Sequence, residues 1–394
     1  MQKKTIDSLQ VRGGKVYVRV DYNVPLDDQG RITDDTRIRA TLPTIKQLLD
    51  GGAALILASH MGRPKGQRVT KYSLAPVAER LAELIGRPVR LAPDCIGPET
   101  EALAAALTPG DVLLLENVRF HEEEETNNPQ FARALASMAD VAVNDAFGVS
   151  HRAHASIVGV AKILPMVAGR LVAEEIHFLE EAVTEPKRPF AAIIGGAKVS
   201  DKIKVLERLV RIVDTLIIGG GMANTFLLAQ GYAVGTSLVE KEACELALRV
   251  LETANDLGKK VLLPQDVITA SAFKQEAAPH IHNVTEIPTD EMILDIGPDT
   301  AEHFSAAVLP AATVLWNGPM GVFEWKAFAQ GTKRVAEAVA ANQGISIVGG
   351  GDSVAAIESC GLTDQITHIS TGGGASLAYL EGQELPGIAC LEEV

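Results

Sequence analysis

Basic residues follow short apolar, β-branched runs at several places in the first half of the chain. After these runs come Asp21-Tyr22-Asn23, His60-Met61-Gly62-Arg63, Glu116-Asn117-Val118-Arg119, Asn144-Asp145-Ala146-Phe147-Gly148 and His151-Arg152-Ala153-His154, and Arg37 lies just beyond the first of them. The planar guanidinium group of arginine matches the oxygens of carboxylates and phosphates. Four arginines and a histidine at one place would repel one another unless a multiply charged anion separated them. These residues therefore predict a binding site for a small polyanion.

Glycine clusters take the corresponding places in the second half. They are Gly195-Gly196-Ala197-Lys198, Gly219-Gly220-Gly221, Gly349-Gly350-Gly351-Asp352-Ser353 and Gly372-Gly373-Gly374. Glycine lets backbone N–H groups approach a phosphate closely, and a helix that follows adds the positive end of its dipole. Asp352, at the start of a helix, is expected to hold a Mg²⁺ ion that bridges nucleotide phosphates. Lys198 and Lys202, four residues apart, are expected to share one helical face and to reach the same phosphates.

Several common motifs are absent, and their absence narrows the class of protein. No G-x-x-x-x-G-K-[ST] occurs and no G-x-G-x-x-G follows the first strand, which disfavours P-loop and dinucleotide-binding proteins. His151 and His154 lack the H-E-x-x-H pattern, so we assign His151 to hydrogen bonding with the anion and His154 to packing. The acidic run Glu122–Glu125 is interpreted as a solvated loop or a first helical turn without a catalytic role.

Twelve short apolar runs alternate with Ala-, Leu- and Glu-rich stretches of helical pattern. The runs are Val16–Val20, Ala54–Ala58, Val89–Leu91, Val112–Leu115, Val141–Val143, Ala191–Ile194, Thr215–Ile218, Lys260–Leu263, Met292–Leu294, Thr313–Leu315, Ser346–Val348 and Ile366–Ile369. Nearly continuous apolar runs predict strands that are buried on both faces, as in parallel sheets. Strands that alternate with helices form right-handed βαβ units and a doubly wound sheet. Such sheets bind ligands outside the carboxyl ends of their strands, where the residues named above lie.

About half of these runs fall on each side of residue 170, which predicts two α/β domains of similar size. We expect an N-terminal domain over residues 1–168 and a C-terminal domain over 185–384. The helix-patterned stretch Val167–Val183, closed by Pro186 and Pro189, predicts a helical connector and hinge over 169–184.

Composition excludes several classes of protein. The 394 residues, 47% hydrophobic and 22% charged, are typical of a soluble protein with a sizeable core. Residues 1–168 hold 20 basic and 20 acidic side chains, so the formal charge of −14 arises in residues 169–394, which argues against nucleic-acid binding through bulk charge. No apolar run reaches the roughly 18–20 residues that span a bilayer, and the first residues do not resemble a secretory signal. The four cysteines form no C-x-x-C pair, which argues against a structural zinc site and a disulfide framework. A reducing, cytoplasmic location is therefore expected.

The order of these motifs resembles the phosphoglycerate kinase family over essentially the full length of the chain. The matching segments are Arg19–Pro25, Ser59–Pro64, Glu116–Arg119, Asp145–His154, Gly195–Lys202, Gly219–Ala223, Trp316–Glu324, Gly349–Ser353 and Ser370–Gly374. The resemblance implies two Rossmann-like domains that face a cleft, with the C-terminal tail 385–394 packed back on the N-terminal domain. It also implies reversible, Mg-dependent phosphoryl transfer from 1,3-bisphosphoglycerate to ADP, giving 3-phosphoglycerate and ATP in glycolysis and gluconeogenesis, by a monomer that bends at a hinge.

The resemblance also implies roles for individual residues. Phosphoglycerate is expected to contact Asp21, Asn23, Arg37, His60, Met61, Gly62, Arg63, Arg119 and Arg152. The nucleotide is expected to contact Gly196, Ala197, Lys198, Lys202, Gly220, Gly221, Asn317, Glu324, Gly350, Gly351, Asp352 and Ser353, with Asp352 as the Mg²⁺ ligand and Glu324 at the ribose hydroxyls. The catalytic groups are expected to be Arg37, Lys198, Lys202, Gly372, Gly373 and Gly374.

The chemistry of such a transfer fits these residue types. A carboxylate nucleophile is already ionised near neutral pH, so no general base is required, and none of the Ser-His-Asp type is evident. Catalysis then rests on alignment and on neutralising the charge of the transferring oxygens. Two alternatives remain open at this point: a bilobed small-molecule binding protein without catalysis, and a two-domain dehydrogenase, which the missing dinucleotide motif disfavours.

Overall fold

The computed structural model describes residues 2–394, which divide into two compact units of similar length. The first unit comprises residues 2–177 together with Glu384–Val394, and the second comprises Phe178–Gln383. Within the described residues, no helix combines the length and apolar composition needed to cross a membrane.

The first unit contains a six-stranded sheet in which every pair of neighbours is parallel. In spatial order its strands are β3 (Val89–Leu91), β4 (Val112–Leu114), β2 (Ala54–Ala58), β1 (Lys15–Val20), β5 (Val141–Asp145) and β6 (Met166–Ala168). The α-helices of this unit are α1 (Thr36–Ala40), α2 (Leu42–Asp50), α3 (Ala75–Ile85), α4 (Pro98–Ala105), α5 (Glu122–Glu125), α6 (Pro129–Ala136) and α15 (Pro386–Ala389), and α7 (Arg170–Thr184) begins in it.

Strand β1 explains why this sheet is buried on both faces. Val16, Val18 and Val20 alternate along it and pack in one core with apolar residues of α2 and α3. Tyr17 points to the other face, where its hydroxyl donates to the backbone carbonyl of Ser156 at 2.9 Å. Because both faces of the strand are buried, a parallel sheet with helical connections packed on both sides is favoured.

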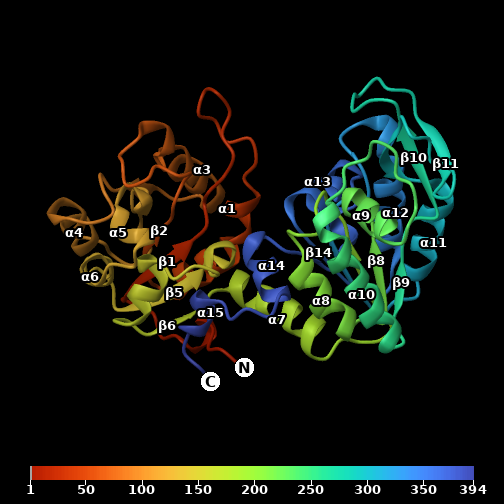
Figure 1. The fold of residues 1–394 in the computed structure, drawn as a ribbon. Coiled ribbons are helices and arrows are strands. Elements are labelled where there is room, and N and C mark those ends of the chain that lie inside the picture. Colours follow the sequence, from red (N-terminus) through yellow and green to blue (C-terminus); the bar gives the residue numbers. More distant parts are fainter. Residues whose placement is uncertain (1) are drawn as a thin grey trace. The chain divides into compact units, whose positions relative to one another are not determined.

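The C-terminal residues belong to the first unit. The buried Asn144 side chain donates to the carbonyl of Gly387 at 2.8 Å, and the amide of Gly387 donates to the carbonyl of Ser150 at 2.8 Å. The amide of Lys4 donates to the carbonyl of Glu392 at 2.8 Å, which joins the two ends of the chain. In Figure 1 the blue helix α15 lies with the yellow strand β6 and the red N-terminal segment.

The second unit contains another six-stranded parallel sheet. In spatial order its strands are β15 (His368–Ile369), β14 (Ile345–Gly349), β13 (Thr313–Asn317), β7 (Phe190–Ile194), β8 (Thr215–Ile218) and β9 (Lys260–Leu262). Its helices are the end of α7, α8 (Ile203–Ile212), α9 (Gly220–Ala229), α10 (Cys244–Asp256), α11 (Pro298–Val308), α12 (Gln330–Ala341), α13 (Gly351–Ser359) and α14 (Gly374–Leu380) (Figure 1). The central core joins Val314 and Trp316 of β13 to Phe304 of α11 and Val339 of α12.

The second unit also carries a three-stranded antiparallel sheet, in the order β11 (His280–Asn283), β10 (Asp266–Ala270) and β12 (Met292–Ile296). Of these strands, the sequence predicted only the run Met292–Leu294, and it wrongly placed that run in the parallel sheet. An apolar run reports burial but not the direction of its neighbour, and the polar β11 has no apolar signal. The fold class itself is confirmed: two α/β units, each with a doubly wound parallel sheet.

The connector differs in detail from the predicted stretch Val167–Val183. Val167 and Ala168 lie in β6, paired with β5, and the helix α7 begins at Arg170. The apolar residues before Gly169 satisfy a strand pattern as well as a helical one, so the pattern alone cannot place the helix start.

Candidate functional site

The polar cluster of the first unit lies where the order of its strands reverses. The chain runs from β1 to β2 on one side of β1, whereas β5 lies on the other side, and ligands bind at such switch points. Asp21 directly follows β1, and its carboxylate pairs with Arg37 from the start of α1. Its other oxygen lies 3.7 Å from Nδ1 of His60, which follows β2. Three predicted residues from three separate segments therefore meet at the carboxyl ends of β1 and β2.

A loop after β2 extends this cluster. The amide of Gly62 donates to Oδ1 of Asn23 at 2.8 Å, and Nη1 of Arg119 donates to the carbonyl of Gly62 at 3.0 Å. Met61 is buried, and its carbonyl accepts a bond of 2.8 Å from Asn117. The structure thus brings Asn23, Met61, Gly62 and Arg119 together, as the sequence predicted.

Positive charge in this cluster exceeds what nearby carboxylates neutralise. Burial lowers the pKa of His60 well below its usual value, and the charges of Arg19, Arg119 and Arg37 lower it further. Burial, followed by the charge of Arg19, lowers the pKa of Arg119 to about 10. Its Nε is buried without a hydrogen bond and lies 3.4 Å from Oε1 of Glu125. An anion would stabilise a buried guanidinium whose Nε–H makes no hydrogen bond.

His154, which the sequence analysis assigned to packing, lies near the same positive charges. Its pKa falls to about 3 through burial and then through the charges of Arg19, Arg119 and Arg152. The imidazole is therefore neutral near pH 7. Arg152 itself is half-buried, with its Nε 3.2 Å from Nε2 of His151. Arg63 differs from these residues because its side chain is exposed.

A fully buried ion pair supports the cluster, and the sequence did not assign either partner to the site. Arg19 of β1 donates from Nε to the hydroxyl of Ser156 at 2.8 Å and lies 4.0 Å from Oε1 of Glu124. Glu124 accepts 2.6 and 2.8 Å bonds from the hydroxyl and amide of Ser156. The interpretation of Glu122–Glu125 as a solvated segment is thus wrong for Glu124, which has no exposed surface. Its partner Arg19 lies about a hundred positions earlier, so local sequence carries no signal of the pair.

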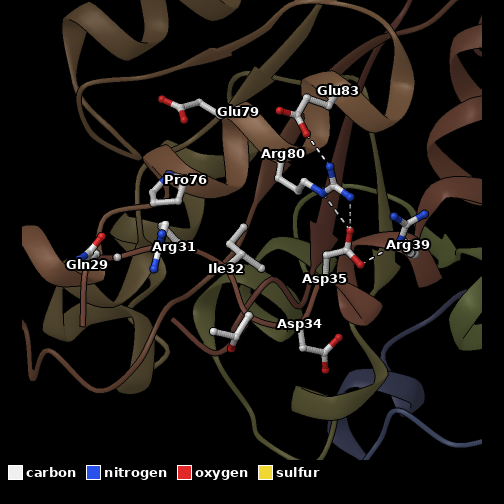
Figure 2. Close-up of a pocket in the computed structure, with 12 residues that line it drawn as sticks. Gln29, Arg31, Ile32, Asp34, Asp35, Arg39, Pro76, Glu79, Arg80 and Glu83 are labelled. Carbon is white, nitrogen blue, oxygen red and sulfur yellow. Dashed lines mark hydrogen bonds and ion pairs between the residues drawn. The ribbon is translucent and has the colours of Figure 1, made fainter. Parts of the chain in front are cut away.

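A cavity of the first unit lies apart from this cluster. It measures about 730 Å³ and lies among the loop 29–35, the end of α1 and α3. Figure 2 shows Arg80 between Asp35 and Glu83, with Arg39 also paired to Asp35. Because these arginines are already neutralised and no predicted site residue lines the cavity, it does not offer the charge that a small polyanion requires.

Lys202 marks the switch point of the second sheet. The chain passes from β7 to β8 on one side, and β13 lies on the other side of β7. Nζ of Lys202 donates to the carbonyls of Gly195, after β7, and Asn317, at the end of β13, at 2.7 and 3.0 Å. Burial lowers the pKa of this amine to about 8, although the negative charges of Asp352 and Asp201 act in the opposite direction.

The prediction that Lys198 and Lys202 share a helical face is wrong. Helix α8 begins at Ile203, so both lysines precede it in a loop. The side chain of Lys198 is exposed, whereas that of Lys202 contacts backbone carbonyls at the ends of β7 and β13. Four-residue spacing matches a helix, but the glycines before Lys198 favour an irregular turn instead.

A cavity of about 570 Å³ lies in the second unit, and Lys202 is not among the residues that line it. Predicted nucleotide residues line it, namely Gly196, Ala197, Gly220, Gly221, Glu324 and Asp352. Its apolar wall includes Leu238, Val267 and Phe273, which the sequence did not single out. Ile293 also lines it, at the position where the resemblance to the family implies a glycine near the nucleotide in some relatives. An apolar slot beside a glycine-lined, charged end suits a base with attached phosphates.

Two glycines at the carboxyl ends of the parallel strands in the second unit cannot be replaced without a shift of the backbone. Gly220 has φ +68°, and a Cβ there would lie 2.7 Å from the amide nitrogen of Gly196. Gly318 has φ +102°, and a Cβ there would lie 2.2 Å from the carbonyl oxygen of Gly195. The close approach of these segments is therefore a specific requirement for glycine.

Asn317 lies at the end of β13, next to the third glycine cluster. Its Nδ2 is buried without a hydrogen bond and would lie 3.1 Å from a Cβ on Gly350. Ser353 is buried, and its hydroxyl accepts a 2.5 Å bond from the amide of Gly318. Gly351 begins α13, and Gly374 begins α14, so the clusters predicted to precede helices do so.

Asp352 fits a Mg²⁺ ligand by its chemistry and position. It lies in the first turn of α13, its side chain is exposed, and it lines the cavity together with Gly220 and Glu324. Mg²⁺ binds through one or two carboxylates together with substrate phosphates, so a single accessible carboxylate at a phosphate edge suffices.

The fold and these edges define a class of protein: a two-unit α/β protein with a cluster of buried cations on one unit and a glycine-edged, nucleotide-type cavity on the other. The phosphoglycerate kinase family model matches residues 6–383. Phosphoglycerate kinase of Moorella thermoacetica is 59% identical, over all of both chains. The cytosolic phosphoglycerate kinase of Triticum aestivum is 57% identical over 99% of this chain and 98% of its own.

Solved structures agree with this match. Phosphoglycerate kinase from Coxiella burnetii superposes with a TM-score of 0.90 at 41% identity, covering 98% of each chain. The enzyme from Pyrococcus horikoshii gives 0.84 at 34% identity, covering 99% of this chain and 98% of that one. The chain therefore belongs to the phosphoglycerate kinase family, which makes it a phosphotransferase with a carboxyl group as acceptor. The alternative of a non-catalytic binding protein is not supported.

The lowered pKa of Lys202 predicts a pH dependence of stability. Unfolding restores the ordinary pKa of 10.5, so between about pH 8 and pH 10.5 the unfolded chain binds a proton that the folded chain lacks. The free energy of unfolding of the wild type should therefore rise relative to that of Lys202→Met across this window and stay parallel below it. Urea denaturation of both proteins from pH 7 to pH 10.5 measures the difference; a constant difference would show that Lys202 titrates normally.

Proposed function

We propose that this chain catalyses reversible, Mg-dependent phosphoryl transfer from 1,3-bisphosphoglycerate to ADP, giving 3-phosphoglycerate and ATP. The observation that carries the proposal is the buried, incompletely neutralised group of cations at the carboxyl ends of β1 and β2. A small acid with one or two phosphates supplies the negative charge that this cluster lacks, and the second unit offers a nucleotide-type cavity.

The first unit is proposed to hold the phosphoglycerate. The Nε–H of Arg119 makes no hydrogen bond and lies 3.4 Å from Glu125, and Asn23 and Asp21 lie at the same strand ends. The exposed Arg63 follows Gly62 directly and is proposed to reach the phosphate from the solvent side. The full set of proposed contacts is Asp21, Asn23, Arg37, His60, Met61, Gly62, Arg63, Arg119 and Arg152.

The second unit is proposed to hold the nucleotide. The apolar wall of its cavity suits the base, and Glu324 at the rim suits the ribose hydroxyls. The phosphates would then lie toward Lys202, the glycine amides and the free Nδ2 of Asn317. The full set of proposed contacts is Gly196, Ala197, Lys198, Lys202, Gly220, Gly221, Asn317, Glu324, Gly350, Gly351, Asp352 and Ser353.

Charge neutralisation is the proposed basis of catalysis, because the carboxylate nucleophile needs no base. Arg37 on one unit and Lys198 and Lys202 on the other supply positive charge, and the amides of Gly372–Gly374 at the start of α14 supply donors. Mg²⁺ held by Asp352 would neutralise the phosphate oxygens and orient them. The chain's own residues fix the geometry in which the carboxylate meets the phosphoryl group.

A coupled assay of ATP formation from 1,3-bisphosphoglycerate and ADP tests this function. The wild type should be active only with Mg²⁺, and Lys202→Ala should lower kcat about 10²–10³-fold because a lost charge-stabilising donor costs roughly 3–4 kcal/mol. Nucleotide affinity should change little. Lys204→Ala, which removes an exposed lysine of α8, is the matched control and should keep the wild-type kcat. A Lys202→Ala enzyme with the wild-type kcat would remove Lys202 from the mechanism.

Arg63→Ala should mainly raise the KM for phosphoglycerate, because the exposed guanidinium contributes binding energy that is equal in ground and transition states. Initial rates at varied phosphoglycerate and saturating Mg-ATP measure the effect. Arg90→Ala, at another exposed arginine of the same unit, should leave the KM unchanged. A normal KM for Arg63→Ala would contradict its assignment to the substrate.

Transfer between substrates held on different units requires that the units bring them together. We propose closure about the segment 169–184, where α7 spans the boundary between the units. Small-angle scattering should show a smaller radius of gyration with both 3-phosphoglycerate and a non-hydrolysable Mg-ATP analogue than with either alone. No contraction with both ligands would argue against closure.

We further propose a cytoplasmic monomer. The four cysteines are free, as in a reducing compartment, and the acidic net charge gives no attraction to nucleic acid. Light scattering after size exclusion measures the oligomeric state, and a mass of twice the chain would overturn the monomer.

A further inference from the structure

A cluster of two histidines and one glutamate lies on the small antiparallel sheet of the second unit. His280 and His282 are two residues apart on β11, so their side chains leave the same face of the strand. Glu291 directly precedes β12, which lies on the other side of β10. Two potential metal ligands on β11 and one just before β12 thus meet across β10, the central strand of the sheet.

The ligand atoms have the spacing of a single coordination sphere. Nδ1 of His280 lies 2.7 Å from Oε1 of Glu291, Nε2 of His282 lies 3.3 Å from Oε2, and all the ligand atoms lie within 4.8 Å of one another. Around a tetrahedral zinc ion with bonds of about 2.0–2.1 Å, neighbouring ligand atoms are about 3.3 Å apart. The side chain of His280 is 51% exposed and has room to open its shorter contact to that spacing.

The nitrogen of His282 is the feature that an ion would satisfy. Nε2 of His282 is buried, and its contact with Glu291 lacks the geometry of a hydrogen bond. A buried polar atom without a hydrogen bond calls for an explanation, and an ion is one of the recognised ones. The neighbouring His280 side chain is half-exposed, so the cluster lies at the surface of the unit.

The glutamate is held in place by a further contact. The hydroxyl of Thr269, on β10 between the two ligand strands, donates to Oε2 of Glu291. Such a bond to a ligating carboxylate fixes its orientation, as is usual around metal sites.

A second cluster, formed by Asp94, Cys95 and His121, is less suited to an ion. Cys95 is fully buried, and burial raises the pKa of its thiol well above the usual value. Metal binding requires the thiolate.

We propose that His280, His282 and Glu291 form a binding site for one divalent transition-metal ion of the zinc type. Two imidazole nitrogens and one carboxylate suit Zn²⁺, Co²⁺ or Ni²⁺, whereas Mg²⁺ prefers oxygen ligands alone. Three protein ligands leave the remaining positions to water. Asp352, the residue proposed for Mg²⁺, is not part of the set.

An ion at this site would tie β11 to the start of β12. Met292 and Ile293 follow Glu291 and line the cavity of the second unit, as does Val267 of β10. The site therefore lies on a sheet that also forms a wall of the nucleotide-type cavity.

Titration of the full-length, chelator-treated protein with Zn²⁺, without nucleotide and with about 1 mM Mg²⁺ present, tests the proposal. Calorimetry should give one site per chain with a Kd in the micromolar range or below. His280→Ala and His282→Ala should each raise this Kd at least tenfold, since even the loss of an outer partner of a metal site costs about 10–100-fold. Zn²⁺ should also raise the thermal midpoint of the wild type and not of His282→Ala.

Three further variants control the experiment. His303→Ala, at an exposed histidine of α11, and His121→Ala, in the second cluster, should bind Zn²⁺ as the wild type does. His282→Gln keeps a polar side chain on β11 and should lose binding like His282→Ala, which separates ligand loss from a disturbed strand. Wild-type affinity in the β11 variants, loss of binding in His121→Ala, or no binding of Zn²⁺ below about 1 mM would each overturn the proposal.

Discussion

The reversal of strand order in each parallel sheet is the constraint on which both halves of the site depend. Parallel strands all place their carboxyl ends on one edge, and a gap opens there only where successive connections turn in opposite directions. In the first unit this happens at β1, with β2 and β5 as neighbours, and in the second at β7, with β8 and β13. Asp21 and Lys202 lie at these two points, so the topology determines where chemistry can occur before any side chain is considered.

Burial of charge gives these edges their properties. Arg19 has no exposed surface and is paired with Glu124. Its positive charge nevertheless lowers the pKa values of His60, Arg119 and His154. Burial first, and this positive charge second, lower the pKa values of both histidines and keep them neutral near pH 7, so the arginines carry the positive charge of the cluster. An anion that enters gains from a field in a poorly solvated place, where charges interact more strongly than in water. Glu124 is thus a support for the cluster: without it, the buried guanidinium of Arg19 would be left unpaired.

Most of the parallel framework could be predicted from the sequence, because strands buried on both faces produce continuous apolar runs. The end residues of these strands were also predictable, since polar residues such as Asp21, His60 and Arg119 interrupt those runs. The strand β11 was not predictable in the same way, because His280–Asn283 is polar and its pairing depends on β10 alone. The apolar wall of the cavity was missed for a related reason: Leu238 and Phe273 come from segments with no periodic pattern and meet only in the folded unit.

Lys202 shows why position within the fold matters more than residue spacing. Its amine donates to two carbonyl oxygens, of Gly195 and Asn317. These dipoles partly compensate for the loss of water around the ammonium group. The pKa of about 8 reflects this incomplete compensation. A phosphate oxygen near Nζ would supply a full negative charge where the carbonyls supply only dipoles, so it would restore the charged form. The desolvation that disfavours the charged form of the free amine therefore strengthens the interaction of the ammonium group with a phosphoryl group. Both effects arise because the ends of β7 and β13 enclose Lys202.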